Sequence, residues 1–338
     1  SELPDWNNQG VSVMEMSHRD AVYVEMTKTA EQDVRDLMAI PDNYAVLFMH
    51  GGGRGQFSAV PQNLAAADAT VDYLNTGIWS EFAIREAKKY TEHVNVLEVV
   101  SKQAGLTQVA DQNSWNLSEN AAYVHYCPNE TVDGIAIHQV PAVSAPLVAD
   151  MSSVILSEPM DVSKFGVIYA GAQKNIGPSG LALVIIRKDL LETQQNTVCT
   201  VMNYKVQAAE HSMYNTPNTF AWYLAGEVFK WIKAEGGVEA MASLNTRKSE
   251  LLYECIDNSS FYRNTIHQNN RSKMNVPFQL ENPALDAQFL QQAKAEGLLA
   301  LKGHRFVGGM RASMYNAMPY EGAKALVDFM TRFAKQHT

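Results

Sequence analysis

Tyr-Ala-Gly-Ala-Gln-Lys-Asn-Ile-Gly-Pro-Ser-Gly, residues 169–180, is the stretch that decides the fold. Residues 166–170 are apolar or small and predict a buried strand, and a glycine-rich turn after Lys174 leads into a further strand at 181–187. Lys174 therefore follows the carboxyl end of a strand, where α/β sheets hold their ligands. Desolvation lowers the pKa of an amine there and makes it a better nucleophile for a Schiff base. An ordinary surface lysine is the alternative, which the small, uncharged neighbours weaken.

Asp150 ends a second expected strand at 146–150, about one βαβ step before Lys174. A buried carboxylate at a strand end needs a partner. A protonated pyridine nitrogen would be one, because the pairing keeps the ring cationic. Taken alone, an Asp at such a place is better explained as the cap of a helix or turn.

Gly51-Gly52-Gly53-Arg54-Gly55 lies between an expected strand at 44–49 and a helix from Gln56. Glycines let backbone N–H groups approach an anion, and a helix N-terminus adds positive potential. The run is not a Walker A loop, because Gly-Lys-Ser/Thr does not follow, and Ser58 breaks a Gly-x-Gly-x-x-Gly pattern. It indicates a phosphate cradle, with a tight strand-to-helix turn as an equally weighted alternative.

The whole chain alternates short apolar runs with helical patterns, which predicts an α/β fold with a largely parallel sheet. Further strands are expected at 121–126, 274–280 and 309–315, and helices at 80–90, 218–235, 238–257 and 284–296. The pattern changes near residue 240. We therefore expect a large ligand-binding domain at 1–240 and a small C-terminal α+β domain at 241–338.

Composition excludes several functions for the 338-residue chain. Its net charge of −9 argues against a nucleic-acid-binding surface, and no apolar run approaches the length of a membrane span. The three cysteines, Cys127, Cys199 and Cys255, form neither a disulfide framework nor a metal pattern, so we expect no metal. Free thiols suit a reducing compartment such as the cytoplasm.

Cationic residues recur near expected turns, at His18-Arg19, Arg54, His304-Arg305 and Arg311. Arg binds carboxylate or phosphate through two parallel hydrogen bonds, so the pairs suit a substrate with two anionic groups. Each taken alone is better explained as a surface ion pair.

Seven stretches together resemble the phosphoserine aminotransferases, a family of fold-type I enzymes that depend on pyridoxal 5′-phosphate (PLP). They are residues 12–19, 50–57, 125–134, 169–180, 214–220, 271–278 and 301–313. The resemblance implies the PLP-dependent transferase fold, with the cofactor bound by the large, mainly parallel-sheet domain. The family usually has an N-terminal segment containing Ser-Gly-Pro ahead of the first of these stretches, which this chain lacks.

The resemblance also implies a role for each candidate residue. Lys174 would carry the cofactor as a Schiff base and shuttle a proton, and Asp150 would pair with the pyridinium nitrogen. The other cofactor contacts would be Gly53, Arg54, Trp79, Thr131 and Gln173, with Asn215 and Thr216 from the other subunit of a homodimer. Substrate contacts would be Arg311 for the α-carboxylate and, for the phosphate, Arg54, His304, Arg305 and, from the neighbouring subunit, His18 and Arg19.

The reaction implied by the resemblance is reversible transamination of 3-phosphohydroxypyruvate with glutamate, giving O-phosphoserine and 2-oxoglutarate in serine biosynthesis. A phosphorylated hydroxythreonine of pyridoxine biosynthesis is a plausible second substrate. One alternative is another fold-type I enzyme, such as an alanine–glyoxylate aminotransferase or a cysteine desulfurase, although no cysteine has an obvious activating setting. The other is a scaffold without activity, which would need none of Lys174, Asp150 and Arg311.

Overall fold

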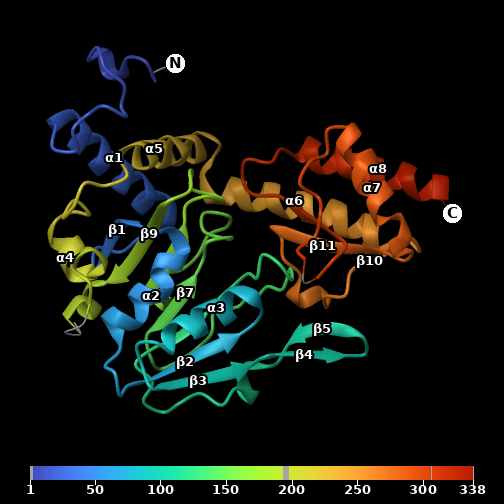
Figure 1. Cartoon of the computed structure of the whole chain (residues 1–338), viewed down its shortest axis with the longest axis horizontal. Coiled ribbons are helices and arrows are strands. Elements are labelled where there is room, and N and C mark those ends of the chain that lie inside the picture. Colours follow the sequence, from blue (N-terminus) through green and yellow to red (C-terminus); the bar gives the residue numbers. More distant parts are fainter. Residues whose placement is uncertain (1–2, 193–197, 306, 338) are drawn as a thin grey trace.

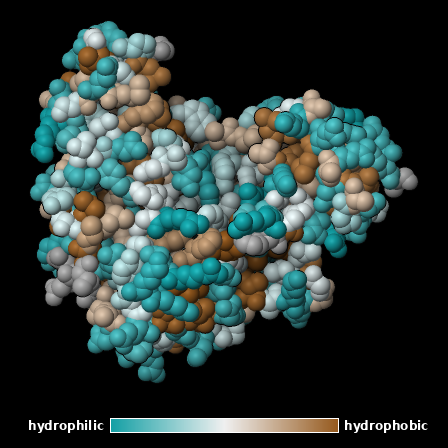
Figure 2. All heavy atoms as spheres, in the orientation of Figure 1, coloured by the Kyte–Doolittle hydropathy of each residue, from teal (hydrophilic) through white to brown (hydrophobic). Residues whose placement is uncertain are grey.

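The structure is a computed structural model that describes residues 3–192, 198–305 and 307–337. The chain forms two lobes, and the long helix α6 (Gly237–Asp257) runs from one into the other (Figure 1). In the space-filling view a notch separates the upper parts of the lobes (Figure 2). The functional residues of the sequence analysis fall mainly in the large lobe.

A seven-stranded sheet forms the centre of the large lobe, in the order β1-β9-β8-β7-β6-β2-β3. Neighbours from β3 to β8 pair in parallel, whereas β9 runs antiparallel to both β8 and β1. The sheet is therefore mainly parallel, as predicted. Its strands are β1 (Tyr44–His50), β2 (Thr70–Asn75), β3 (His93–Glu98), β6 (Val124–Tyr126), β7 (Leu147–Asp150), β8 (Val167–Gly171) and β9 (Leu181–Arg187).

Helices cover both faces of this sheet, because its central strands are apolar on both sides and alternate residues point to opposite faces. The covering helices are α1 (Ala21–Met38), α2 (Gly52–Leu64), α3 (Ile78–Ala87), α4 (Tyr204–Ala209) and α5 (Thr219–Ala234). On one face Phe48 of β1 stacks on Trp222 of α5. On the other face Tyr169 of β8 packs against Phe57 of α2.

The small lobe consists of a three-stranded antiparallel sheet backed by helices. Its aromatic core centres on the fully buried Phe289. The elements are β10 (Tyr262–Arg263), β11 (Asn275–Leu280), β12 (Met310–Ser313), α7 (Asp286–Ala295) and α8 (Tyr320–His337). A hairpin of the large lobe, β4 (Val100–Gln103) and β5 (Leu106–Val109), reaches toward this lobe through a bridge between Thr107 and Ile266. The short 3-10 helices are η1 (Trp6–Asn8), η2 (Gln112–Ser114), η3 (Val162–Lys164), η4 (Lys188–Glu192), η5 (Thr200–Met202), η6 (Gln268–Asn270) and η7 (Pro283–Leu285).

The strands predicted around the glycine run, Asp150 and Lys174 are present within one or two residues. The start of α2 differs from the prediction, because the helix begins at Gly52 inside the glycine run and not at Gln56. Gly51 has a φ of +87°, which glycine adopts without strain, and this residue turns the chain from β1 directly into the helix. The glycine run is thus the first turn of α2.

The boundary near residue 240 stays a prediction. It falls inside α6, whose first turns belong to the core of the large lobe through Val238 and Met241. Leu252, further along the same helix, is in the core of the small lobe. None of the helices in the described part of the chain is both long and apolar enough to cross a membrane.

Candidate active site

A cavity of about 340 Å³ lies where the first turn of α2 meets the carboxyl ends of β7 and β8. This volume is in the range of small-molecule and cofactor sites. The cavity brings together seven of the residues singled out in the sequence, namely Gly53, Arg54, Trp79, Thr131, Asp150, Gln173 and Lys174. Residues far apart in the chain thus meet at the sheet edge where α/β folds bind ligands.

Lys174 follows β8 in the turn before β9 and is partly buried. Its Nζ donates a hydrogen bond of 2.7 Å to Oγ1 of Thr131 and lies 5.7 Å from the centre of the Trp79 ring. Burial lowers the pKa of Lys174, and the charge of Arg311 acts in the same direction, while Asp150 and Glu130 act against it. A lysine with a lowered pKa is neutral more of the time, so it can attack a carbonyl carbon or accept a proton.

Asp150 is the last residue of β7 and is 7% exposed. Its Oδ1 accepts hydrogen bonds from the backbone N–H and the hydroxyl of Ser152, at 3.0 and 2.6 Å. Burial raises the pKa of Asp150, which the hydrogen bonds from Ser152 and the charge of Lys174 partly offset. The cavity therefore contains a carboxylate that a cationic ligand group would stabilise.

The glycine run lines the same cavity. The N–H groups in the first turn of α2 have no partners within the helix, and they face a ligand with the positive end of the helix dipole. A Cβ on Gly53 would lie 3.0 Å from the Ser152 hydroxyl oxygen, so a side chain here would crowd Ser152, and glycine leaves the backbone N–H groups open to the cavity. This arrangement suits a phosphate group.

Trp79 and Arg54 line the remaining side. Trp79 is the second residue of α3, and its indole Nε1 is buried without a hydrogen-bond partner in the described structure. The Arg54 guanidinium lies 4.4 Å from the Phe82 ring and 5.5 Å from the Trp79 ring, which holds it at the mouth of the cavity.

The other candidate residues do not line this cavity. Asn215 lies next to the glycine turn, with its Nδ2 at 3.1 Å from Nε2 of His50, and Thr216 is exposed. Arg311 lies on β12 of the small lobe, close enough to affect the pKa of Lys174, and His304 affects the pKa of Asp133. Three candidates remain. His18 and Arg19 lie just before α1, and Arg305 is exposed.

Several cavity residues were not singled out in the sequence. Ser152 and Ser153 lie two and three residues after Asp150, and this closeness in the sequence is the signal that could have identified them. Asn129 lies in the stretch 125–134 that carries the family resemblance, but it was assigned no role there. It is 4% exposed and donates hydrogen bonds to Ser153 and Asn275. Asn129 therefore links the cavity to β11 of the small lobe.

The cysteines do not supply a nucleophile for this cavity. Cys127 lines it, but burial raises the pKa of the thiol, and the charges of Glu130 and Asp150 raise it further. A thiolate is therefore disfavoured where a desulfurase would need one. Burial also raises the pKa of Cys255, and Cys199 is exposed and outside the cavity.

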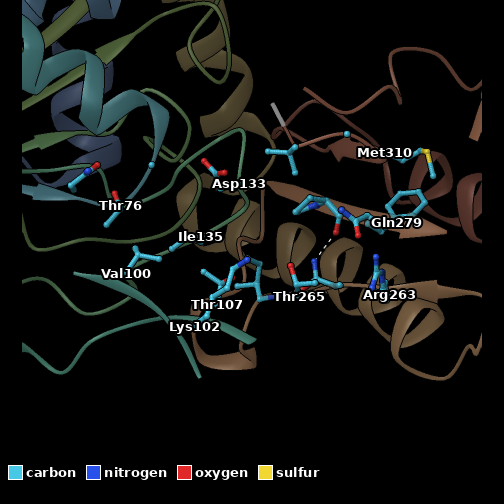
Figure 3. A pocket seen from close by; sticks show the side chains of 18 of the residues that line it. Thr76, Val100, Lys102, Thr107, Asp133, Ile135, Arg263, Thr265, Gln279 and Met310 are labelled. Atoms are coloured by element: carbon cyan, nitrogen blue, oxygen red, sulfur yellow. Dashed lines mark hydrogen bonds between the residues drawn. The ribbon is translucent and has the colours of Figure 1, made fainter. Parts of the chain in front are cut away.

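A larger cleft of about 620 Å³ lies between the lobes and is separate from the chemistry described above. Figure 3 shows Thr76 and Asp133 on its large-lobe side, and Arg263 and Gln279 on its small-lobe side. It contains no residue of the lysine cavity. Within the described ranges, no group of three or more His, Cys, Asp or Glu side chains could hold a metal ion.

The residues of the lysine cavity fit PLP. A glycine-lined helix start is present for a phosphate, a buried carboxylate for a pyridine nitrogen, and an amine of lowered pKa for an aldehyde. The indole of Trp79 supplies a flat apolar wall beside the amine. Fold and cavity together define a PLP-dependent enzyme of the α/β class.

Comparisons with known proteins identify the family. The chain matches the family model of the class-V aminotransferases over residues 1–326. A curated phosphoserine aminotransferase of Idiomarina loihiensis is 65% identical over 335 residues, which cover 99% of this chain and 93% of that protein. This chain belongs to the class-V aminotransferases, in their phosphoserine aminotransferase family.

Two solved structures agree with this assignment. The PLP-bound phosphoserine aminotransferase of Trichomonas vaginalis is 43% identical, with a TM-score of 0.92 and coverage of 98% of this chain and 94% of that one. The phosphoserine aminotransferase of Bacillus circulans is 41% identical, with a TM-score of 0.95 and coverage of 100% and 93%. The predicted fold, cofactor and class of reaction are thereby confirmed.

The lowered pKa of Lys174 predicts an effect on stability. The folded apoprotein releases this proton more readily than the unfolded chain, so the charged lysine destabilises the fold below its lowered pKa. This penalty disappears as the pH rises through the lowered pKa toward the ordinary value of 10.5. We expect apoprotein with Lys174→Met to melt at a higher temperature than the wild-type apoprotein at neutral pH, with a difference that narrows in alkali. A variant that is less stable at every pH would contradict the pKa assignment.

Proposed function

We propose that the cavity performs the transamination between glutamate and 3-phosphohydroxypyruvate with the residues assigned to it above. The observation that carries the proposal is the meeting of Lys174, Asp150 and the first turn of α2 in one cavity. Bound PLP supplies an aldehyde that takes up an amino group and a ring that withdraws electrons from the substrate Cα. Everything else is done by the protein.

Each cavity residue has a proposed role, which its position in the cavity supports. The first turn of α2, through the backbone N–H groups of Gly53 and Arg54, would bind the cofactor phosphate together with Gln173, and Asp150 would orient the ring and hold a proton on its nitrogen. Thr131, which accepts the lysine's hydrogen bond at 2.7 Å, would bind the phenolic side of the ring. Lys174 would hold the cofactor through its amine, and the same amine would move a proton at the substrate Cα.

The substrate has a carboxylate at one end and a phosphate at the other. Arg311 is the proposed carboxylate ligand, since a guanidinium binds carboxylate with two parallel bonds. Arg54 reaches the mouth of the cavity from the other side, where its stacking on Phe82 fixes it. The proposed phosphate site consists of Arg54, His304 and Arg305, together with His18 and Arg19 of a second subunit.

A homodimer is part of the proposal, because Asn215, Thr216, His18 and Arg19 do not line the cavity of their own chain. A second copy would place these residues at its neighbour's site. Three free cysteines also fit a reducing compartment, and we place the enzyme in the cytoplasm.

Shared sites predict complementation between two inactive variants. One variant carries Lys174→Ala, and the other carries Asn215→Ala together with Thr216→Ala. In a mixed dimer, one site combines an intact lysine with an intact Asn215 and Thr216, and the other site lacks all three. Random mixing makes about half of the dimers mixed, so activity at limiting cofactor should recover to about one quarter of wild type. Activity that stays at the mean of the separate variants would exclude shared sites.

Substrate choice tests the proposed reaction. With 2-oxoglutarate as acceptor, we expect O-phosphoserine to be a far better donor than alanine or cysteine. Arg54→Ala should reduce kcat/KM for O-phosphoserine by about 10- to 100-fold, because one charge-assisted contact to the phosphate is lost, with little change for alanine. If Arg54→Ala lowers kcat/KM equally for both donors, Arg54 does not bind the substrate phosphate. Preference for alanine in the wild type would overturn the substrate assignment.

A further inference from the structure

The start of α3 is held by a buried carboxylate that has no role in the reaction described so far. Glu130 is 0% exposed and lies in the turn after β6, directly before Thr131. Its Oε2 accepts a hydrogen bond of 3.0 Å from the backbone N–H of Trp79, and its Oε1 accepts one of 2.9 Å from that of Ser80. The Ser80 hydroxyl, also at 2.9 Å, and the Thr76 hydroxyl at 3.4 Å donate to Oε1 as well.

These contacts satisfy N–H groups that the helix itself leaves without partners, and the carboxylate faces the positive end of the helix dipole. Burial raises the pKa of Glu130 to about 7, and the N–H and hydroxyl groups of Ser80 and the N–H of Trp79 act in the opposite direction. The donors of α3 thus favour the ionised form. Glu130 and the first turn of α3 stabilise each other.

Gly77, which has no side chain, leaves space for this contact. A Cβ there would lie 2.9 Å from Cδ of Glu130 and 2.7 Å from Oδ2 of Asp133. Only glycine therefore lets both carboxylates approach the helix start so closely. Asp133 also lines the interlobe cleft, as Figure 3 shows.

Two parts of the cofactor cavity depend on this arrangement. Trp79, whose N–H binds Glu130, places its ring centre 5.7 Å from Nζ of Lys174. Phe82, one turn further along α3, carries the Arg54 guanidinium. The residue after Glu130, Thr131, accepts the hydrogen bond of Lys174. Glu130 therefore connects the indole wall of the cavity to the residue that contacts the lysine.

We propose that Glu130 is a positioning residue, which fixes the Trp79 indole against Lys174 by anchoring the first turn of α3 through its backbone. This inference rests on the proposed role of Trp79 beside the cofactor. In the Glu130→Gln variant, an amide NH₂ replaces one acceptor oxygen and faces an N–H donor, so the helix start must shift. Gly77→Ala should have the same effect, because the added methyl group pushes the carboxylate away.

Asp72, in β2 of the large-lobe sheet, offers a matched control. It is also 0% exposed and accepts hydrogen bonds from the Ser118 N–H at 2.7 Å, the Ser118 hydroxyl at 2.6 Å and Nδ2 of Asn95 at 3.0 Å. It lies outside the cofactor cavity. Asp72→Asn therefore reports the general effect of disturbing a buried, hydrogen-bonded carboxylate.

The test is a double-mutant cycle of Glu130→Gln and Trp79→Phe, with PLP affinity of the apoproteins measured by equilibrium dialysis. We expect Glu130→Gln to weaken PLP binding by about 10- to 100-fold, as for outer-shell partners of metal ligands. In the Trp79→Phe background the same change should have little further effect, because it acts through the indole. Asp72→Asn should lower the melting temperature while leaving PLP affinity within about twofold.

A second measurement needs no cofactor. The difference in near-UV circular dichroism between an apoprotein that retains Trp79 and the matching Trp79→Phe variant isolates the signal of this indole, and that signal should shrink in the Glu130→Gln background. An unchanged indole signal, or PLP affinities of Glu130→Gln and Asp72→Asn that fall equally, would overturn the inference. If Trp79→Phe alone leaves PLP affinity unchanged, the proposed role of Trp79 fails instead, and the dichroism still decides whether Glu130 positions the indole.

Discussion

The Lys174→Ala variant is expected to lose at least about 10⁴-fold in the rate of transamination, the upper end of what one positioned proton-transfer group contributes. Two functions disappear together. The covalent attachment of the cofactor needs an amine of lowered pKa, and proton movement at the substrate Cα needs the same amine near its neutral state. No other lysine lines the cavity in the described ranges.

The measurement is single-turnover conversion of O-phosphoserine with PLP in excess, so that weaker cofactor binding does not mask the chemical step. Lys248→Met is an informative control, because Lys248 is buried and its pKa is lowered to about 8, yet it binds backbone oxygens of residues 314, 315 and 318 and does not line this cavity. We expect that variant to lose stability more than turnover. A Lys174→Ala variant within about tenfold of wild type would contradict the assignment.

The second large effect is expected for Asp150→Asn. An anionic partner keeps a proton on the pyridine nitrogen, and a neutral amide does not. Removing one partner of a buried ion pair costs about 3–5 kcal/mol, which corresponds to a decrease in kcat of roughly 10²- to 10⁴-fold if the whole cost falls on the reaction. The amide retains the shape of the side chain and an oxygen that can accept from Ser152, so the fold should persist.

Steady-state kinetics at saturating PLP measure this effect, and Asp72→Asn again provides a buried carboxylate of the same sheet for comparison. PLP analogues with a permanent positive charge on the ring nitrogen add a sharper test. They should restore part of the Asp150→Asn activity, because they no longer need the anion to keep the ring cationic. A loss that such an analogue leaves unchanged would assign Asp150 a role in folding and not in the reaction.

Much of the site was predictable because it lies at strand ends. Strand patterns of buried residues placed Asp150 and Lys174 at the carboxyl edge of a sheet, and the glycine run marked a helix start. The strand β2 was missed, because Asp72 in its middle breaks the apolar pattern. Its burial depends on Ser118 and Asn95, which are distant in sequence. No local pattern reports such a partner.

The remaining parts depend on contacts that one chain's sequence does not encode locally. Glu130 accepts hydrogen bonds from backbone N–H groups of α3, and Trp79 lies 51 residues earlier in the chain. Every residue except proline has a backbone N–H, so residue types do not reveal which of them is the donor. His18, Arg19, Asn215 and Thr216 lie outside the cavity of their own chain. Their roles came from the resemblance alone and stay predictions until a second subunit is shown to complete the site.

The most direct test of the account is the near-visible absorbance of purified protein with PLP, recorded before and after addition of O-phosphoserine. We predict a band of lysine-bound cofactor that shifts with O-phosphoserine, returns with 2-oxoglutarate, and is absent from Lys174→Ala. A band that responds to alanine or cysteine but not to O-phosphoserine would contradict the substrate. Failure of the wild-type protein to form any band would contradict the central claim that Lys174 holds PLP in this cavity.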